Sequence, residues 1–254
     1  MHVQEFSDAL DALYPKTRSC PWDNDGLMCC TDPAAQIKKV LVALDATRKV
    51  LEEAAARQFD LVLTHHPLLF KGPKTIVPST ATGGRVIAAL QSNIAVLSLH
   101  TRLDAGEGGV NDCLAKSLGL AGPLKVFGDS ESPTLGRIGA TDISDGNAFT
   151  AHVKEALRAP AVCAYLCRPV RNVAVCGGSG GDLVFPALAA GADTLVTGEC
   201  GYNLCLDGAD SGINIITAGH FHTEQPVCRR LAQLAQDIAG ADTRIISSDT
   251  GVLL

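Results

Sequence analysis

The sequence predicts an α/β protein with two α/β lobes, each built on a mainly parallel or mixed sheet. Short apolar runs alternate with segments of helical periodicity, which is typical of strand–helix–strand units with right-handed crossovers. Apolar residues make up 46% of the 254 residues and aromatic residues only 4%, a composition that favours layered packing of small aliphatic side chains. Residues 121–135, rich in Gly, Pro, Ser and Asp, interrupt the alternation and are predicted to be a linker.

The N-terminal half is expected to open with an amphipathic helix, because Val3, Phe6, Leu10 and Leu13 recur on one helical face. Apolar runs then predict strands, and helical spacing predicts the helices between them. Strands are expected at residues 38–45, 59–66 and 93–100, and helices at residues 46–58, 83–91 and 109–120.

The alternation continues after the predicted linker. Strands are expected at residues 135–141, 161–166, 172–178, 192–199, 213–220 and 243–249, and helices at residues 147–159 and 223–240. A glycine-rich segment, residues 177–182, is expected to turn into a further helix. We assign residues 1–122 and 217–254 to one lobe and residues 123–216 to a second lobe, and no internal sequence repeat is visible.

Charge and cysteine usage exclude several classes of partner. Lys and Arg total 21 against 27 Asp and Glu, and no basic block stands out, which argues against a nucleic-acid partner. The acidic N-terminal stretch is not a signal peptide, and no apolar run approaches membrane-spanning length. We therefore expect a cytoplasmic protein whose ten cysteines, none in a CxxC pair, are free thiols.

Unusual polar residues follow three of the predicted strands. They are His65 and His66, then His100 and Asp104, and then His220, His222 and Glu224. In an open parallel sheet, sites form beyond the carboxyl ends of the strands, so these segments are expected to converge. A single histidine at a strand end is more often structural, but three converging segments of matching chemistry favour a metal site.

The spacing of these residues suggests two ions. Neighbouring side chains of an extended chain point to opposite sides, so His65 and His66 are expected to serve one ion each. His220 and Glu224 lie four residues apart and are close enough to face one site. Asp104 and Glu224 are oxygen donors able to bridge two cations, and imidazole with carboxylate suits Zn, Fe, Mn, Co or Ni. These residues belong to the lobe of residues 1–122 and 217–254, which we predict to be the metal-binding lobe.

Two other segments leave alternatives open. The segment "GGSGG", residues 177–181, is either an anion-cradling nest or a tight strand-to-helix turn. Its Gly-x-Ser-x-Gly pattern also allows a nucleophile elbow of a serine hydrolase around Ser179, with His220 or His222 as the base. Trp22, the only tryptophan, lies in a loop where it either lines a cleft or caps the core.

Seen as a whole, the chain resembles the GTP cyclohydrolase I type 2 homologues, a family of dinuclear metal proteins also called NGG-interacting-factor-like. The resemblance runs nearly end to end and rests on several segments of the sequence. These are "WDNDGL", "LTHHPLLF", "LHTRLDAGEGGVND", "LGRIG", "GGSGGD", "TGE" and "AGHFHTE", in that order.

The resemblance implies a two-metal site, two α/β lobes, no inserted third domain, and a ring-shaped homohexamer. The implied metal ligands are His65, His66, Asp104, His220 and Glu224, which are also the residues that the spacing selects. Three positions depart from the family pattern: Arg102 where Asn is usual, Asn203 where His often follows "TGE", and His222 where a small residue is usual.

Two functional hypotheses follow. The first is a metal-dependent hydrolase, cyclohydrolase-like, in which two divalent ions activate a water against a small anionic substrate. His100 is then a candidate for orienting the donors or carrying a proton from beside them. The second hypothesis is a non-catalytic adaptor or metal carrier, because the sequence does not separate a catalytic ion from a cargo ion.

Overall fold

Residues 1–130 and 134–248 are described by the computed structural model and fold into two units. Among these described residues, unit 1 comprises Met1–Leu103 and residues 228–248, and unit 2 lies within Asp104–Val227. The chain leaves unit 1 within α4 (Thr101–Ala105) and returns at the start of α10 (Val227–Ala239). Each unit has its own sheet with helices, which confirms the prediction of two α/β lobes with mixed sheets.

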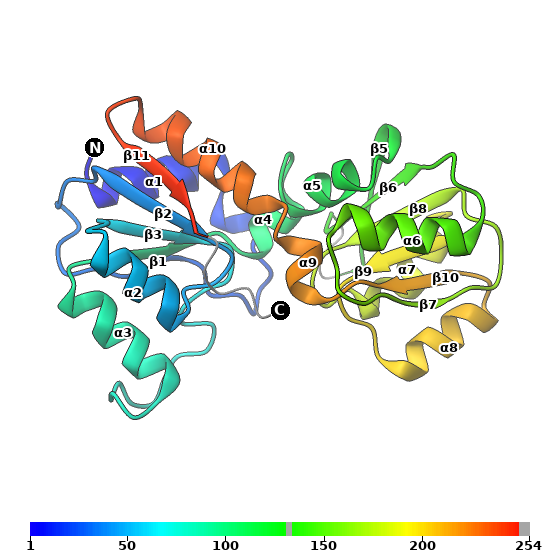
Figure 1. Ribbon diagram of the computed structural model, residues 1–254, viewed down its shortest axis with the longest axis horizontal. Coiled ribbons are helices and arrows are strands. Elements are labelled where there is room, and N and C mark those ends of the chain that lie inside the picture. The colour runs from blue at the N-terminus through cyan, green and yellow to red at the C-terminus, as the bar shows by residue number, and fades with distance from the viewer. Residues whose placement is uncertain (131–133, 249–254) are drawn as a thin grey trace. The chain divides into compact units, whose positions relative to one another are not determined.

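The sheet of unit 1 has five strands in the order β1-β4-β3-β2-β11 (Figure 1). Only β1 is antiparallel to its neighbour, and the other pairs are parallel. The elements of unit 1 are α1 (Val3–Leu13), η1 (Lys16–Arg18), β1 (Gly26–Cys29), β2 (Lys39–Ala43), α2 (Arg48–Ala56), β3 (Leu61–Thr64), α3 (Ala81–Gln91), β4 (Ala95–Ser98), most of α10, and β11 (Arg244–Ser247).

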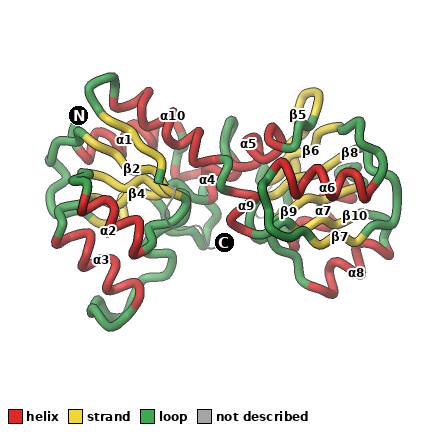
Figure 2. Tube along the Cα trace, viewed as in Figure 1, coloured by secondary structure: helices red, strands yellow, loops and turns green. Residues whose placement is uncertain are grey.

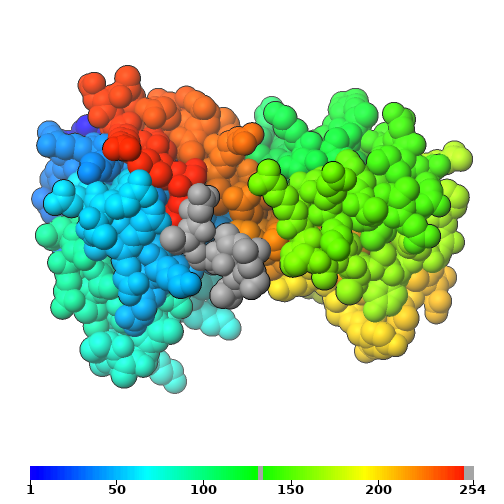
Figure 3. Space-filling view, viewed as in Figure 1, coloured from blue at the N-terminus to red at the C-terminus, as the bar shows by residue number. Residues whose placement is uncertain are grey.

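Helices α2 and α3 cover one face of this sheet because both crossovers are right-handed and the strands run in the same direction. Leu41, Val62 and Val96 come from three adjacent strands and pack on this face against Val50 of α2 and Val86 of α3. Figure 1 places α1 and α10 on the other face, and Figure 3 shows the residues of α2 and α3 as part of the outer surface of unit 1.

The sheet of unit 2 has six strands in the order β5-β6-β8-β9-β10-β7 (Figure 2). The β8–β9 and β9–β10 pairs are parallel, and the other pairs are antiparallel. The elements of unit 2 are α5 (Val110–Ser117), β5 (Ala121–Phe127), β6 (Gly136–Ala140), α6 (Gly146–Ala156), β7 (Cys163–Tyr165), β8 (Asn172–Cys176), η2 (Gly181–Leu183), α7 (Val184–Ala189), β9 (Thr194–Thr197), α8 (Tyr202–Asp210), β10 (Asn214–Thr217) and α9 (His220–Glu224).

Two helical layers enclose the sheet of unit 2. On one face, Leu114 of α5 and Phe149 of α6 pack against Val173 of β8. On the other face, α7 and α8 pack against alternate residues of the same strands. Because α5 packs on this sheet, residues 104–122 belong to unit 2, and the boundaries of the units differ from the 122/123 and 216/217 expected from the sequence.

The two units share a structural repeat although no sequence repeat is visible. In each, three adjacent parallel strands, β2-β3-β4 or β8-β9-β10, carry an antiparallel strand beside the last of them. An aspartate makes equivalent hydrogen bonds at the start of the first strand in each of these two sets. Asp60 accepts from the amides of residues 38 and 39, and Asp193 accepts from those of residues 171 and 172. The repeat therefore consists of the strand pairing and of one aspartate in each unit.

Several predicted elements differ from the structure. The linker prediction is wrong for its first part, because β5 pairs with β6 there; residues 131–133 of that segment lie outside the described residues. The helix predicted at residues 223–240 is divided into α9 and α10, with Pro226, which lacks a backbone N–H, between them. Strand β1 and helix α8 were not predicted, and residue 249 of the last predicted strand lies outside the described residues.

Two further expectations can be compared with the structure. All ten cysteines are free thiols, as predicted. Within residues 1–130 and 134–248, no helix has both the length and the apolar character that crossing a membrane requires.

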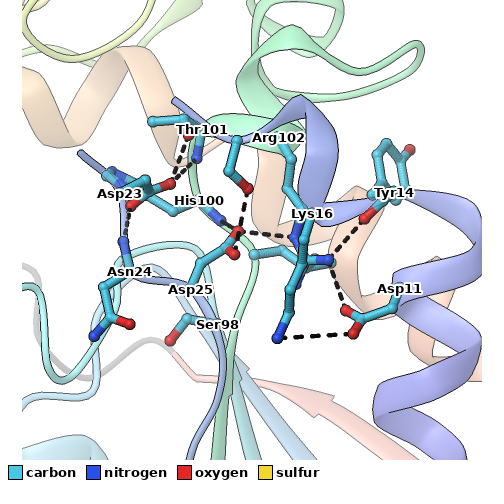
Figure 4. A network of polar contacts seen from close by, with 12 residues as sticks. Asp11, Tyr14, Lys16, Asp23, Asn24, Asp25, Ser98, His100, Thr101 and Arg102 are labelled. Atoms are coloured by element: carbon cyan, nitrogen blue, oxygen red, sulfur yellow. Dashed lines mark hydrogen bonds and ion pairs between the residues drawn. The ribbon is translucent and has the colours of Figure 1, made fainter. Parts of the chain in front are cut away.

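Arg102, at the start of α4, ties three segments of unit 1 together (Figure 4). Its side chain is fully buried, and Nε donates to Asp25 Oδ2 at 2.8 Å. Nη1 donates to Asp11 Oδ1 of α1 at 2.6 Å and to the backbone carbonyl of Tyr14 at 2.7 Å. The guanidinium therefore fixes the loop before β1 relative to α1 and α4.

We predict that Arg102→Met lowers the free energy of unfolding by about 3–5 kcal/mol, because the Asp25 carboxylate, only 3% exposed, would lose its cationic partner. Denaturant unfolding followed by circular dichroism measures this change. Lys16→Met is the matched control, since Lys16 is 56% exposed and lies 3.8 Å from Asp11. Its effect should stay below about 1 kcal/mol. Equal losses in the two variants would contradict the role given to Arg102.

Candidate metal centre

Three imidazoles gather in unit 1 at the carboxyl ends of neighbouring strands. His65 and His66 follow β3, and His100 follows β4. Their ring centroids are 4.9–5.7 Å apart, and one nitrogen of each ring lies within 4.8 Å of the corresponding nitrogens of the others. We call these three residues the imidazole cluster.

Each ring of the imidazole cluster is held through Nδ1. The distances to the acceptors are 2.8 Å from His65 to the Leu99 carbonyl, 2.8 Å from His66 to Asp45 Oδ1 and 2.7 Å from His100 to Asp23 Oδ1. A carbonyl or an ionised carboxylate only accepts, so Nδ1 must carry the hydrogen in each ring. The lone pair of each neutral ring is then on Nε2, the arrangement found in histidines that ligate metals.

The turn after β3 explains why His65 and His66 lie side by side. Thr64 Oγ1 donates to the His66 carbonyl at 2.7 Å, and Ser98 Oγ donates to the same carbonyl at 3.2 Å. These bonds bend the chain where the strand ends. The expectation that the two rings point to opposite sides is therefore wrong, because the alternation of an extended strand stops at Thr64.

Asp23 is an anionic anchor for His100. Burial opposes ionisation of its carboxyl, but hydrogen bonds from His100 and Thr101 outweigh burial and lower the pKa of Asp23 from an ordinary 3.8 to about 2. The carboxylate accepts from Thr101 N at 3.0 Å and Thr101 Oγ1 at 2.5 Å, besides the bond to His100 (Figure 4). Asp23 is consequently ionised at neutral pH and keeps the His100 ring in one orientation.

Unit 2 has a second group of donors, which we call the carboxylate cluster: Asp104, His220 and Glu224. His220 and Glu224 stand one turn apart on α9, with Nε2 of His220 3.1 Å from Glu224 Oε2. An oxygen of Asp104, from the end of α4, lies within 4.8 Å of one from Glu224. Glu224 is only 4% exposed. Two carboxylates at this distance repel each other, so a bound cation would stabilise the pair.

Glu199, just after β9, orients the imidazole of this cluster. Its Oε1 lies 3.3 Å from Nδ1 of His220, and its Oε2 accepts from Ser179 Oγ at 2.5 Å. The hydrogen bond from Ser179 and the nearby His220 lower the pKa of Glu199. Because Ser179 donates to a carboxylate rather than to an imidazole, the geometry does not support a serine nucleophile at this position.

Glycines allow the backbone to approach the carboxylate cluster closely. Gly178 has a φ of +65°, and a Cβ built on it would overlap Glu224 Oε1 and lie 3.0 Å from His220 Nε2. A Cβ on Gly198 would lie 2.8 Å from the backbone Cα of His220. The segment "GGSGG" is thus a tight turn, as one of the two sequence interpretations had it, and its small size leaves room for the donors.

Cys176 lies near the carboxylate cluster but does not add a thiolate. Burial raises the pKa of its thiol strongly, and the charges of Asp104 and Glu224 raise it further. The thiol is therefore neutral. The donor sets of both clusters consist of imidazole nitrogen and carboxylate oxygen, which fits a divalent Zn, Fe, Mn, Co or Ni ion.

The sequence-predicted residues fall into both clusters. The ligands expected at residues 65 and 66 are in the imidazole cluster, those at 104, 220 and 224 are in the carboxylate cluster, and the clusters belong to different units. His100, expected only to support the donors, lies as close to the other two imidazoles as a donor would. His222 is in neither cluster, and Asn203 is exposed on α8.

Sequence reasoning missed the three acidic residues that orient the imidazoles: Asp23, Asp45 and Glu199. Asp45 and Glu199 each come two residues after a parallel strand, at the same edge of the sheet as the histidines. A search for acids at the ends of all predicted parallel strands would have found both. Asp23 follows no predicted strand, and its role depends on a contact with a residue 77 positions away.

Comparison with known proteins shows the family and the fold. The model of the family described as Duf34/NIF3 (NGG1p interacting factor 3) matches residues 1–250. A GTP cyclohydrolase 1 type 2 homolog of Clostridium perfringens is 31% identical over 98% of this chain and 96% of its own length. The Schizosaccharomyces pombe protein NIF3 homolog is 30% identical over 96% of this chain and 94% of its own length.

Solved structures show the same fold. The hypothetical protein SA1388 of Staphylococcus aureus superposes with a TM-score of 0.90 and covers 100% of this chain and 99% of its own, at 24% identity. Neither chain has a substantial segment left over, in keeping with the absence of an inserted third domain. From the full-length match to the family model and the 31% identical relative, it follows that this chain belongs to the Duf34/NIF3 family.

Proposed function

We propose that this protein binds two divalent metal ions and hydrolyses a small anionic substrate beside them. The proposed ligands are those expected from the sequence: His65, His66, Asp104, His220 and Glu224. Relatives named GTP cyclohydrolase 1 type 2 homolog make a nucleotide a natural first substrate to test.

The observation that carries the proposal is the common orientation of the three rings of the imidazole cluster. In His65, His66 and His100, Nδ1 lies within 2.8 Å of a carbonyl or carboxylate oxygen, so a neutral ring has the lone pair on Nε2. This is the arrangement found in histidines that ligate metals. Asp104 and Glu224, whose carboxylate oxygens lie within 4.8 Å of each other, supply the negative charge that divalent ions require.

Bound divalent ions would lower the pKa of a coordinated water and polarise the bond to be broken. The residues of the chain would orient the ligands and transfer protons. Asp45, Asp23 and Glu199 hold the imidazoles at fixed angles and increase their basicity. His100, backed by the ionised Asp23, is placed to accept a proton from the attacking water or return it to the leaving group.

We predict that His65→Ala and Glu224→Ala each reduce bound metal and hydrolytic activity together, because each removes a proposed ligand. Protein purified anaerobically, stripped with a chelator and reloaded with Mn²⁺, Fe²⁺ or Zn²⁺ would be analysed for ions per chain. The same samples would be assayed with GTP, phosphoesters and small amides. His152→Ala is the control, since His152 lies on α6 and its Nε2 contacts the Leu118 carbonyl.

The wild type and His152→Ala are expected to hold two ions per chain, and the substitutions at residues 65 and 224 are expected to hold fewer. Hydrolysis at the wild-type rate by a metal-free variant that combines His65→Ala with Glu224→Ala would refute metal-dependent hydrolysis. Two tightly held ions with no turnover of any substrate would favour a metal carrier over a hydrolase.

A second substitution leaves all the proposed metal ligands in place. Gly178→Ala should weaken metal binding by about 10- to 100-fold, because the new Cβ displaces the carboxylate of Glu224 from its position beside His220. Titration with Zn²⁺ against a competing chelator measures this affinity. Gly119→Ala is the matched control, since Gly119 has the same φ of +65° and a Cβ there would meet nothing within 4 Å. Unchanged affinity in a folded Gly178→Ala protein would show that Glu224 is not a ligand.

A further inference from the structure

Two exposed aromatic rings stand against the imidazole cluster. Trp22 is 56% exposed and Phe70 is 43% exposed, and their ring centroids are 5.9 Å apart at an interplanar angle of 73°. Both rings also contact the ring of His100, at 6.2 and 5.8 Å between centroids. An apolar surface therefore borders the donors directly. We call Trp22 and Phe70 the aromatic pair.

The loop that carries Trp22 is anchored on both sides of the ring. Asp23 accepts from Thr101 and pairs with His100, and Asp25 accepts from Arg102 Nε at 2.8 Å and from His100 N at 3.2 Å (Figure 4). On the other side, Cys20 N donates to Thr101 Oγ1 at 2.9 Å. The backbone around the exposed indole is thus fixed by buried and half-buried polar contacts.

The second ring is tied to the same loop. Asn24 Nδ2 donates to the carbonyl of Leu69, the residue before Phe70. Because both backbones are held by the fold, binding a ligand on these rings would require little additional ordering of the chain. Large, rigid side chains that are exposed and already fixed in place are characteristic of binding surfaces.

We propose that the aromatic pair stacks the planar ring of a nitrogen heteroaromatic substrate, such as a nucleobase, and so selects which substrates reach the metal ligands. The inference rests on the proposed function, since it gives the small anionic substrate a flat ring. Because the two rings stand at 73° to each other, a planar ring can lie parallel to one of them and meet the other edge to face, and both geometries are favourable for aromatic rings. Base–aromatic stacking typically changes affinity by about 5- to 100-fold for each aromatic side chain removed.

The test uses the fact that Trp22 is the only tryptophan of the chain. Metal-loaded protein would be titrated with guanosine, with GTP and with inorganic tripolyphosphate, while indole fluorescence is recorded. Guanosine and GTP should change the emission of Trp22 with saturation, and tripolyphosphate, which has no ring, should not. Phe70→Ala keeps the fluorescent reporter and should weaken guanosine binding by about 5- to 100-fold.

Trp22→Leu, measured by calorimetry, should weaken guanosine binding by a similar factor. Phe185→Ala is the control and should bind guanosine like the wild type. Phe185 is as exposed as Phe70 but lies on α7 in unit 2. Wild-type affinity in both Phe70→Ala and Trp22→Leu would overturn the inference, as would the absence of saturable binding by guanosine and GTP. Metal content, measured on the same samples, separates the two proposals. Failure of ring binding with both ions present contradicts only the aromatic pair, whereas a wild type without ions contradicts the metal centre.

Discussion

The hydrogen bond between the Nδ1 of each ring in the imidazole cluster and an oxygen acceptor is the interaction on which the candidate metal centre depends. A ring nitrogen that donates to an oxygen leaves the other nitrogen of a neutral ring as the acceptor, so three short contacts decide how His65, His66 and His100 can act. The acceptors come from separate parts of the chain. The folding of each unit therefore prepares the donors before any ion binds, and the loss of one acceptor would free a ring to rotate.

The repeated topology of the two units explains why donors occur at equivalent places. After each set of three parallel strands comes a helix of five residues, with an imidazole at or just before its start and a carboxylate four residues later. After β4 this pair is His100, just before α4, and Asp104; after β10 it is His220 and Glu224. The surrounding sequence differs because the supports differ: Arg102 and buried aspartates fix the first helix, and glycines make room for the second.

Much of this arrangement could be predicted from the sequence, because apolar periodicity sets the strands and parallel strands carry polar residues at one edge. The histidines and carboxylates of both clusters were found in this way. The relative directions of His65 and His66 were not, since strand alternation says nothing about the bend after Thr64. Nor could the pairing of His100 with Asp23 be predicted, because 77 residues separate them and only the folded loop brings them together.

The most direct test of the account is the tautomeric state of the histidines, measured by long-range proton–nitrogen NMR on protein labelled with ¹⁵N-histidine. At about pH 8, without metal, the account predicts that the rings of His65, His66 and His100 carry a hydrogen on Nδ1 and none on Nε2. Addition of Zn²⁺ should then shift the Nε2 resonances of the proposed ligands. Rings that carry the hydrogen on Nε2, or Nε2 resonances that Zn²⁺ leaves unchanged, would contradict it.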